Sequence, residues 1–163
     1  MIKYIKGDLF KHISSFNRII YIPHVCNDLG KMGKGFAFVL SQNFPEVKKR
    51  YLHWFKVKNL PEEGEFELGK TQFVLIKNQS SIICCNMIAQ HGLISVDNPR
   101  PLRYNALAKC MDQIANYFLW YNEIEIHCPK FGSQLAGGNW NFVENLIEDC
   151  WIKRGIEVFV YEN

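Results

Sequence analysis

Two glycine-rich loops carry the residue types whose chemistry is easiest to read from the sequence. The first, Asn27–Gly35, reads NDLGKMGKG and places Lys34 between Gly33 and Gly35. The second, Pro129–Trp140, reads PKFGSQLAGGNW. Glycine lets backbone N–H groups approach a phosphate, and a lysine adds positive charge. Each loop alone is also typical of a plain strand-to-helix connection, but the two together favour a shared anion site. Neither has the GxxxxGK[ST] or the GxGxxG spacing of the common nucleotide-binding motifs.

Polar side chains also stand where predicted strands end. Asp8 follows the first strand, where its carboxylate could accept from an adenine amine or cap a local turn. Asn27 could bond a ribose hydroxyl or brace its own loop. His91 follows a central strand and could act as an acid or base near neutral pH, although a lone histidine is more often structural.

Strands alternate with helices along most of the chain. The expected strands are Ile2–Ile5, Arg18–Val25, Thr71–Ile76, Ser81–Met87, Ile124–Cys128 and Ile156–Tyr161, of which the third and fourth should pair. The expected helices are Gly35–Gln42, Pro45–Lys58, Leu102–Tyr121 and Trp140–Lys153, with Gly155 as a C-cap and with internal loops at Asn59–Gly64 and Gly92–Pro101. The alternation predicts an α/β fold of three α/β/α layers with a mixed, largely parallel central sheet. Such sheets bind ligands beyond the carboxyl ends of their strands.

Length and composition narrow the class of protein. The 163 residues predict a single domain spanning 1–163, and a net charge of +3 does not by itself indicate nucleic-acid binding. No CxxC pair occurs, so we expect reduced, buried thiols and no metal at the six cysteines: Cys26, Cys84, Cys85, Cys110, Cys128 and Cys150. Without a visible signal peptide or membrane span, the sequence predicts a soluble, cytoplasmic protein, with no membrane partner and a monomeric state.

The chain resembles the macrodomains, which are ADP-ribose-binding modules. The matching stretches are Gly7–Phe10, His24–Ala37 and Pro129–Trp140, with the FPEV segment at Phe44–Val47. They follow one another in the family's order and cover essentially the whole chain. The resemblance implies the macrodomain fold and a site for ADP-ribose.

The resemblance also implies a role for individual residues. Asp8 would read the adenine amine, the backbone N–H of Leu9 would assist it, and Asn27 would contact the distal ribose. The other implied substrate-binding residues lie in or beside the two glycine loops: Gly7, Cys26, Gly33, Lys34, Gly35, Phe36, Ala37, Phe131, Gly132, Ser133, Gln134, Leu135, Ala136 and Gly137.

Three branches of the family differ in the reaction that they catalyse. The HxCN strand end (His24, Cys26 and Asn27) and the ICC strand at Ile83–Cys85 are similar to the ADP-ribose 1''-phosphate phosphatases. Two branches that release ADP-ribose from protein or nucleic acid are less similar. One of them has an aspartate in the first glycine loop, which this chain lacks. The other has a lysine after the central strand and an aspartate in the second loop; here no lysine follows that strand, and Ala136 stands at the aspartate position.

The resemblance therefore implies a phosphatase acting on ADP-ribose 1''-phosphate. We expect His24 and His91 to transfer protons, Lys34 to offset phosphate charge and Asp28 to orient water, without a metal or other cofactor. The expected partners are ADP-ribose or ADP-ribose 1''-phosphate, with ADP-ribosylated macromolecules as further candidates. The alternatives are a non-catalytic ADP-ribose reader, a hydrolase of ADP-ribosylated protein or nucleic acid, and a domain that binds another nucleotide.

Overall fold

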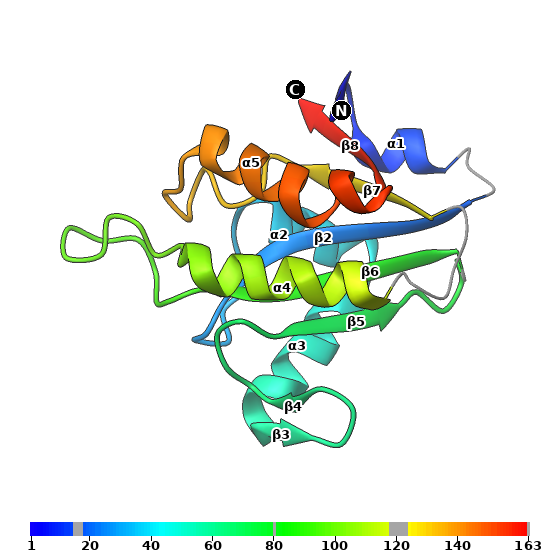
Figure 1. The fold of residues 1–163 in the computed structure, drawn as a ribbon. Coiled ribbons are helices and arrows are strands. Elements are labelled where there is room, and N and C mark those ends of the chain that lie inside the picture. The colour runs from blue at the N-terminus through cyan, green and yellow to red at the C-terminus, as the bar shows by residue number, and fades with distance from the viewer. Residues whose placement is uncertain (15–17, 80, 118–123, 163) are drawn as a thin grey trace.

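A six-stranded sheet forms the centre of the protein (Figure 1). The computed structural model describes residues 1–14, 18–79, 81–117 and 124–162. The strands, in the order in which they lie side by side, are β1 (Lys3–Lys6), β8 (Glu157–Glu162), β7 (Ile124–Pro129), β2 (Ile19–Asn27), β6 (Ile82–Gln90) and β5 (Thr71–Leu75). All neighbouring pairs are parallel except β5 with β6. The predicted mixed, largely parallel sheet is confirmed, as is the expected pairing of β5 with β6, which the structure shows to be antiparallel.

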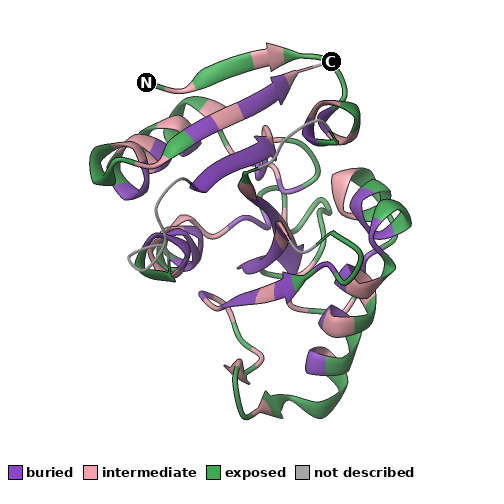
Figure 2. Ribbon diagram, turned by 90° about the vertical axis from the view of Figure 1, so that its right-hand side faces the viewer, coloured by how far each residue is buried: buried purple, intermediate pink, exposed green. Residues whose placement is uncertain are grey.

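Helices cover both faces of the sheet (Figures 1 and 2). One layer holds α1 (Leu9–Ile13), α2 (Gly35–Asn43) and α3 (Pro45–Val57). The other holds α4 (Tyr104–Tyr117) and α5 (Trp140–Cys150), which the 3-10 helix η2 (Ile152–Arg154) follows. The predicted α/β/α arrangement is therefore confirmed.

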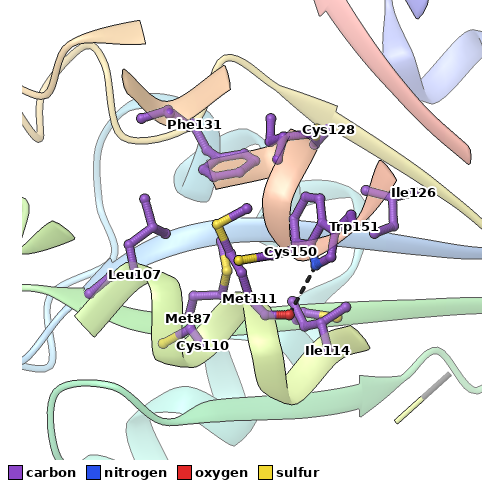
Figure 3. Close-up of a cluster of buried hydrophobic side chains, with 14 of the residues drawn as sticks. Met87, Leu107, Cys110, Met111, Ile114, Ile126, Cys128, Phe131, Cys150 and Trp151 are labelled. Atoms are coloured by element: carbon purple, nitrogen blue, oxygen red, sulfur yellow. Dashed lines mark hydrogen bonds between the residues drawn. The ribbon is translucent and has the colours of Figure 1, made fainter. Parts of the chain in front are cut away.

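Each face of the sheet has its own hydrophobic core. Along β2, Ile20 and Ile22 pack toward α1–α3, whereas Tyr21 packs toward α4 and α5, because successive side chains of a strand point to opposite faces. In the core beneath α4 and α5, the Trp151 indole N–H donates to the Met111 carbonyl at 2.9 Å (Figure 3). This fully buried ring therefore ties the junction between α5 and η2 to α4. All six cysteines are free and buried, as the sequence predicts.

Short elements account for most differences from the predicted fold. The expected loop at Asn59–Gly64 contains a small antiparallel hairpin of β3 (Asn59–Leu60) and β4 (Gly64–Glu65). The Trp54 indole N–H donates to the Gly64 carbonyl at 2.9 Å and so ties this hairpin to α3. The helix α1 was not predicted, because five residues are too few to show helical periodicity.

Boundaries of the longer helices also differ. Leu102 lies outside α4 because it forms a bridge with Gln90 instead. The last part of the helix predicted over Leu102–Tyr121, residues 118–121, lies outside the described residues. The C-terminal helix ends at Cys150, and Gly155 caps the following η2 with φ of 84°, which confirms its capping role. Within the described residues, no helix has the length and apolar character needed to cross a bilayer.

Candidate functional site along the carboxyl edge of the sheet

The five parallel strands end at one edge of the sheet, and the predicted site residues follow them there. In spatial order, Asp8 follows β1, residues 130–139 follow β7, residues 28–34 follow β2 and His91 follows β6. Because the strands are parallel, loops that are far apart in the sequence meet at this edge. The topology therefore brings both glycine loops and three of the polar candidates to one side of the protein.

At the β1 end of this edge, Asp8 borders a pocket. Its Oδ1 accepts a hydrogen bond from the Phe10 N–H at 2.9 Å and so caps α1. The capping alternative is thus realised, yet within the described part of the chain Oδ2 makes no hydrogen bond and stays available to a ligand. The pocket has a volume of about 320 Å³ and is lined by Ile5, Lys6, Gly7, Asp8, Lys11, His12 and Tyr161. Tyr161 was missed from the sequence, although its place on the strand beside β1 was a usable signal.

The loop after β2 is held in shape by Asn27. Its Oδ1 accepts from the N–H groups of Leu29 at 3.0 Å and Lys31 at 3.2 Å, and its Nδ2 donates to the Lys31 carbonyl at 2.6 Å. The Tyr51 hydroxyl donates to the Asn27 carbonyl at 2.6 Å. Asn27 is only 7% exposed, so the structure shows the bracing role that the sequence left open.

The N-terminus of α2 faces the second glycine loop. Lys34 occupies the N-cap position in an extended conformation and gives no side-chain cap, so the first N–H groups of α2 have no capping side chain. Gly33 has open space around it, and a Cβ on Gly35 would lie 3.1 Å from a methyl group of Leu135. The two loops therefore approach each other at the start of α2, which can attract an anion.

Phe36 joins the start of α2 to α1. Its ring stacks on Phe10 with centroids 5.9 Å apart and packs edge-on against His24 at 6.3 Å. This contact places the first glycine loop next to the helix that Asp8 caps.

The second glycine loop folds tightly on itself. The Gly138 N–H donates to the Gly132 carbonyl at 2.8 Å, and the Gly137 N–H donates to the Gln134 carbonyl at 2.9 Å. The Ala136 carbonyl accepts from the Leu102 N–H at 3.0 Å, which ties the loop to the segment before α4. Of the predicted residues in this loop, Phe131, Gly132 and Ala136 are buried, whereas Gln134 and Leu135 are exposed.

Gly137 provides a test of this loop. Gly137→Ala is expected to destabilise the protein by about 2 kcal/mol, because φ is +73° and the new Cβ would lie 2.5 Å from the Pro99 carbonyl oxygen. Gly33→Ala is the matched control, since a Cβ there meets nothing within 4 Å. Urea unfolding of both variants measures the difference. Equal stability of the two variants would show that the loop rearranges around the new methyl group without lowering the free energy of unfolding.

Asp28 and His91 form a pair across the ends of β2 and β6. Asp28 Oδ2 lies 2.7 Å from His91 Nδ1, and Asp28 Oδ1 accepts from the Gly92 N–H at 2.9 Å. The His91 side chain is 61% exposed, whereas that of Asp28 is 19% exposed. Both carboxylate oxygens are therefore engaged, so Asp28 holds the imidazole. Its predicted role in orienting water stays a prediction, since each carboxylate oxygen can accept a second hydrogen bond.

The backbone of His91 is fixed on both sides. Its N–H donates to the Pro101 carbonyl at 2.9 Å, and its carbonyl accepts from Asn98 Nδ2 at 2.8 Å. Asn98 also donates to the Leu93 carbonyl at 3.0 Å. The loop of residues 92–101 therefore supports the exposed imidazole.

His24 lies in the core, apart from the exposed pair. It is 2% exposed, and its Nε2 donates to Asn86 Oδ1 at 2.5 Å, since Asn86 Nδ2 donates to Gln72 and Val47. Burial lowers the pKa of His24 to about 4, and the Asn86 hydrogen bond opposes the shift only in part. Strand β2 is buried on both faces, so its end does not present His24 to a substrate. The expected proton transfer by His24 does not fit this position.

Cys26 and Leu9 are also buried. Burial raises the pKa of the Cys26 thiol, whose sulfur lies 3.7 Å from His24 Nε2. The Leu9 side chain packs into the core beneath α1, so only backbone groups at these two positions could face a ligand.

The predicted residues Gly7, Gly33, Lys34 and Gly35 are exposed, and Ala37 is half-buried. Among the described residues, no three His, Cys, Asp or Glu side chains gather as metal ligands.

Comparison with known proteins assigns the family. No protein-family model matches the chain. A macrodomain protein from Streptomyces coelicolor is 36% identical, with a TM-score of 0.81, over 100% of this chain and 99% of that one. A protein of unknown function from Bacteroides thetaiotaomicron is 34% identical, with a TM-score of 0.88, over 100% and 98%. The ADP-ribose 1''-phosphate phosphatase of Candida albicans is 26% identical over 91% of this chain and 93% of its own. The chain belongs to the macrodomain family.

Proposed function

We propose that this macrodomain binds ADP-ribose 1''-phosphate along the carboxyl edge and hydrolyses its terminal phosphate. The Candida albicans relative, named for this reaction, supports the proposal. The observation that carries it is the Asp28–His91 pair, whose imidazole is exposed and follows β6, beside the first glycine loop. A hydrolase needs such a group within reach of the phosphate, whereas a binding module does not.

The order of the strands sets the orientation in which the substrate would lie along the edge of the sheet. Asp8 and its pocket lie at β1 and β8, the glycine loops at β7 and β2, and His91 at β6. From β8 to β6 the sheet spans three strand spacings, about 14 Å. The base would lie in the pocket beside Asp8, the diphosphate over the glycine loops, and the distal ribose with its phosphate beside His91.

The central part of this site binds charge through the backbone. The uncapped N–H groups at the start of α2 and those of the second loop can donate to the diphosphate oxygens. Lys34 is exposed at the same helix end and can offset the charge of the diphosphate or of the transferred phosphoryl group. The half-buried Phe36 and Ala37 in the first turn of α2 would pack beneath the distal ribose.

His91 is the group that we propose to transfer the proton. When the ring is neutral and its Nδ1–H donates to Asp28, Nε2 has a free lone pair that can accept a proton from the attacking water. The water oxygen bonds to phosphorus while the bond between phosphorus and ribose O1'' breaks. His91 then returns the proton to O1''. The products are ADP-ribose and inorganic phosphate, so atoms and charge balance.

Asp8 supplies a test of the binding mode. Asp8→Ala is expected to weaken ADP-ribose binding about tenfold, because it removes the acceptor for the adenine amine. Asp8→Ala also removes the α1 cap, so Asp8→Asn serves as the control. It keeps an oxygen for the cap but places its NH2 group, a donor, toward the base, so it should weaken ADP-ribose binding as Asp8→Ala does. Isothermal calorimetry measures both. Unchanged affinity in Asp8→Ala would place the base elsewhere.

A panel of substrates tests the proposed reaction against its alternatives. The wild-type protein is incubated separately with ADP-ribose 1''-phosphate, ADP-ribosylated protein and ADP-ribosylated DNA. We expect phosphate release from the first and no release of ADP-ribose from the other two. Release of ADP-ribose from protein or DNA alone would identify a hydrolase of modified macromolecules. Binding of ADP-ribose without any release would identify a reader.

A further inference from the structure

The peptide group between His91 and Gly92 is held from both sides. Its N–H, which belongs to Gly92, donates to Asp28 Oδ1 at 2.9 Å. Its C=O, which belongs to His91, accepts from Asn98 Nδ2 at 2.8 Å. The N–H and C=O of a trans peptide lie in one plane and point in opposite directions, so Asp28 and Asn98 bond this plane from opposite sides. The orientation of the peptide therefore depends on both side chains.

This peptide matters because Asp28 bonds two adjacent residues at once. Its Oδ1 accepts from the Gly92 N–H, while its Oδ2 lies 2.7 Å from His91 Nδ1. The two bonds together hold the planar carboxylate in one orientation relative to the imidazole. A rotation of the His91–Gly92 peptide would break the bond to Oδ1 and let the carboxylate turn away from the ring. Asn98 opposes that rotation through its bond to the His91 carbonyl.

The partners of the Asn98 side chain fix the orientation of its amide. Nδ2 faces the carbonyls of His91 at 2.8 Å and Leu93 at 3.0 Å, which can only accept. Oδ1 faces the Arg103 guanidinium at 3.4 Å, which can only donate. Both N–H groups of the amide are therefore engaged with the backbone, so the side chain supports the loop and has no donor left for a substrate.

The rest of the loop gives Asn98 a fixed base. Its backbone exchanges two hydrogen bonds with that of Ser95, each of 3.1 Å. The Arg103 guanidinium, which also bonds Asn98, donates to the Arg100 carbonyl at 2.5 Å. The backbone N–H of Arg103 donates to the Ala89 carbonyl of β6 at 2.9 Å. The amide that bonds the His91 carbonyl is thus anchored to the same strand that His91 follows.

We propose that Asn98 is a positioning residue, which holds the Asp28–His91 pair in place by bonding the His91–Gly92 peptide on the side opposite Asp28. This inference rests on the proposed hydrolysis of ADP-ribose 1''-phosphate, in which His91 transfers the proton. A general base must lie within hydrogen-bond reach of the water that it deprotonates, and a small displacement lowers the rate strongly. Changes at Asn98 should therefore affect the reaction rather than the binding of the diphosphate.

Steady-state kinetics on two variants test this role. Asn98→Ala removes the bond to the peptide and should lower kcat about 10- to 100-fold, with KM changed less than about threefold. Asn98→Asp has nearly the same shape and can still accept from Arg103, but it offers no donor to the His91 carbonyl, so kcat should fall at least as far. A wild-type kcat in Asn98→Asp would show that the bond to Arg103 is sufficient, and it would overturn the proposal.

A second set of variants separates positioning from general support of the fold. In a His91→Ala background, Asn98→Ala should lower the residual rate by less than about a further twofold, because no imidazole remains to be positioned. The full loss in that background would show that Asn98 acts on something else. Ser95→Ala is the matched control, since it removes only the bond from the Asn98 N–H to Ser95 Oγ, and it should leave kcat unchanged. Urea unfolding checks that each variant is folded.

Nuclear magnetic resonance reads the state of the imidazole without relying on the reaction. Proton–nitrogen correlation spectra report which ring nitrogen carries the hydrogen, and the His91 signals are those lost in His91→Ala. At alkaline pH, where imidazoles are neutral, wild-type His91 should show the Nδ1–H form that bonds Asp28, and Asn98→Ala should shift it toward the Nε2–H form.

The two readouts distinguish this inference from the proposed function. An unchanged His91 signal and an unchanged kcat in Asn98→Ala would overturn the role of Asn98 alone. A wild-type protein that releases no phosphate would overturn the proposed reaction, whereas a changed His91 signal in Asn98→Ala would still support the positioning of the pair by Asn98.

Discussion

His91→Ala is expected to lower the rate of phosphate release from ADP-ribose 1''-phosphate about 100- to 10,000-fold, the range typical of a lost acid–base group. The reason is that His91 Nε2 is the proton acceptor that Asp28 holds at the end of the anion loops. ADP-ribose affinity should change by less than about threefold, because the lost ring contributes to the reaction and not to the loops that bind the diphosphate. Steady-state kinetics and calorimetry on the same sample measure the two effects.

Two further variants sharpen this expectation. Asp28→Asn keeps a side chain that can bond the imidazole, but it removes the carboxylate that fixes the Nδ1–H tautomer. It should therefore lower the rate less than His91→Ala does. His53→Ala is the matched control, since His53 is an exposed histidine on α3 and its loss should leave the rate unchanged. An undiminished rate in His91→Ala would place the proton transfer on another residue.

Acidification is expected to destabilise the protein through His24 before most carboxylates titrate. The pKa of His24 is about 4 in the folded protein, because burial penalises the charged ring, and about 6.5 in the unfolded chain. Between these values the unfolded chain binds more protons, so the free energy of unfolding falls as the pH falls. From pH 7 to pH 4.5 the loss from this residue should be roughly 2–3 kcal/mol.

His24→Gln isolates this contribution. A glutamine amide can donate to Asn86 Oδ1 as the imidazole does, but it does not titrate. Urea unfolding at pH 7 and pH 4.5 should show a smaller loss of stability in the variant than in the wild type by about 2 kcal/mol or more. His127 also has a lowered pKa, but it is present in both proteins and cancels in the comparison. Equal losses in the two proteins would show that His24 is not buried as the neutral form.

The fold was predictable where long apolar runs make long elements. The runs in β2 and β6 read as strands, and the stripes of α3, α4 and α5 read as helices, because each buries a large surface. The hairpin of β3 and β4 and the helix α1 could not be predicted in this way. Their stability depends on single contacts, the Trp54–Gly64 hydrogen bond and the Asp8 cap, and they are too short for a hydrophobic pattern to repeat along them.

The position of the site at the carboxyl edge of the sheet could be predicted from the sequence, but the arrangement of its side chains could not. Parallel strands with glycine loops after them indicate where ligands bind, whatever the detailed contacts. The pairing of Asp28 with His91 depends on the register of β2 with β6, in which Asn27 lies opposite Gln90. Asp28 and His91 are 63 positions apart in the sequence, so no local pattern predicts their contact. The burial of His24 was hidden because β2 is apolar on both faces, so alternation gives no sign of which side chains face solvent.

The most direct test of the central claim is the time course of the products formed from ADP-ribose 1''-phosphate by the wild-type protein and by His91→Ala. The account predicts that the wild type releases inorganic phosphate and ADP-ribose in equal amounts over many turnovers, and that His91→Ala binds ADP-ribose but releases phosphate at least about 100-fold more slowly. A wild-type protein that binds ADP-ribose tightly yet releases no phosphate, or a variant as fast as the wild type, would contradict it.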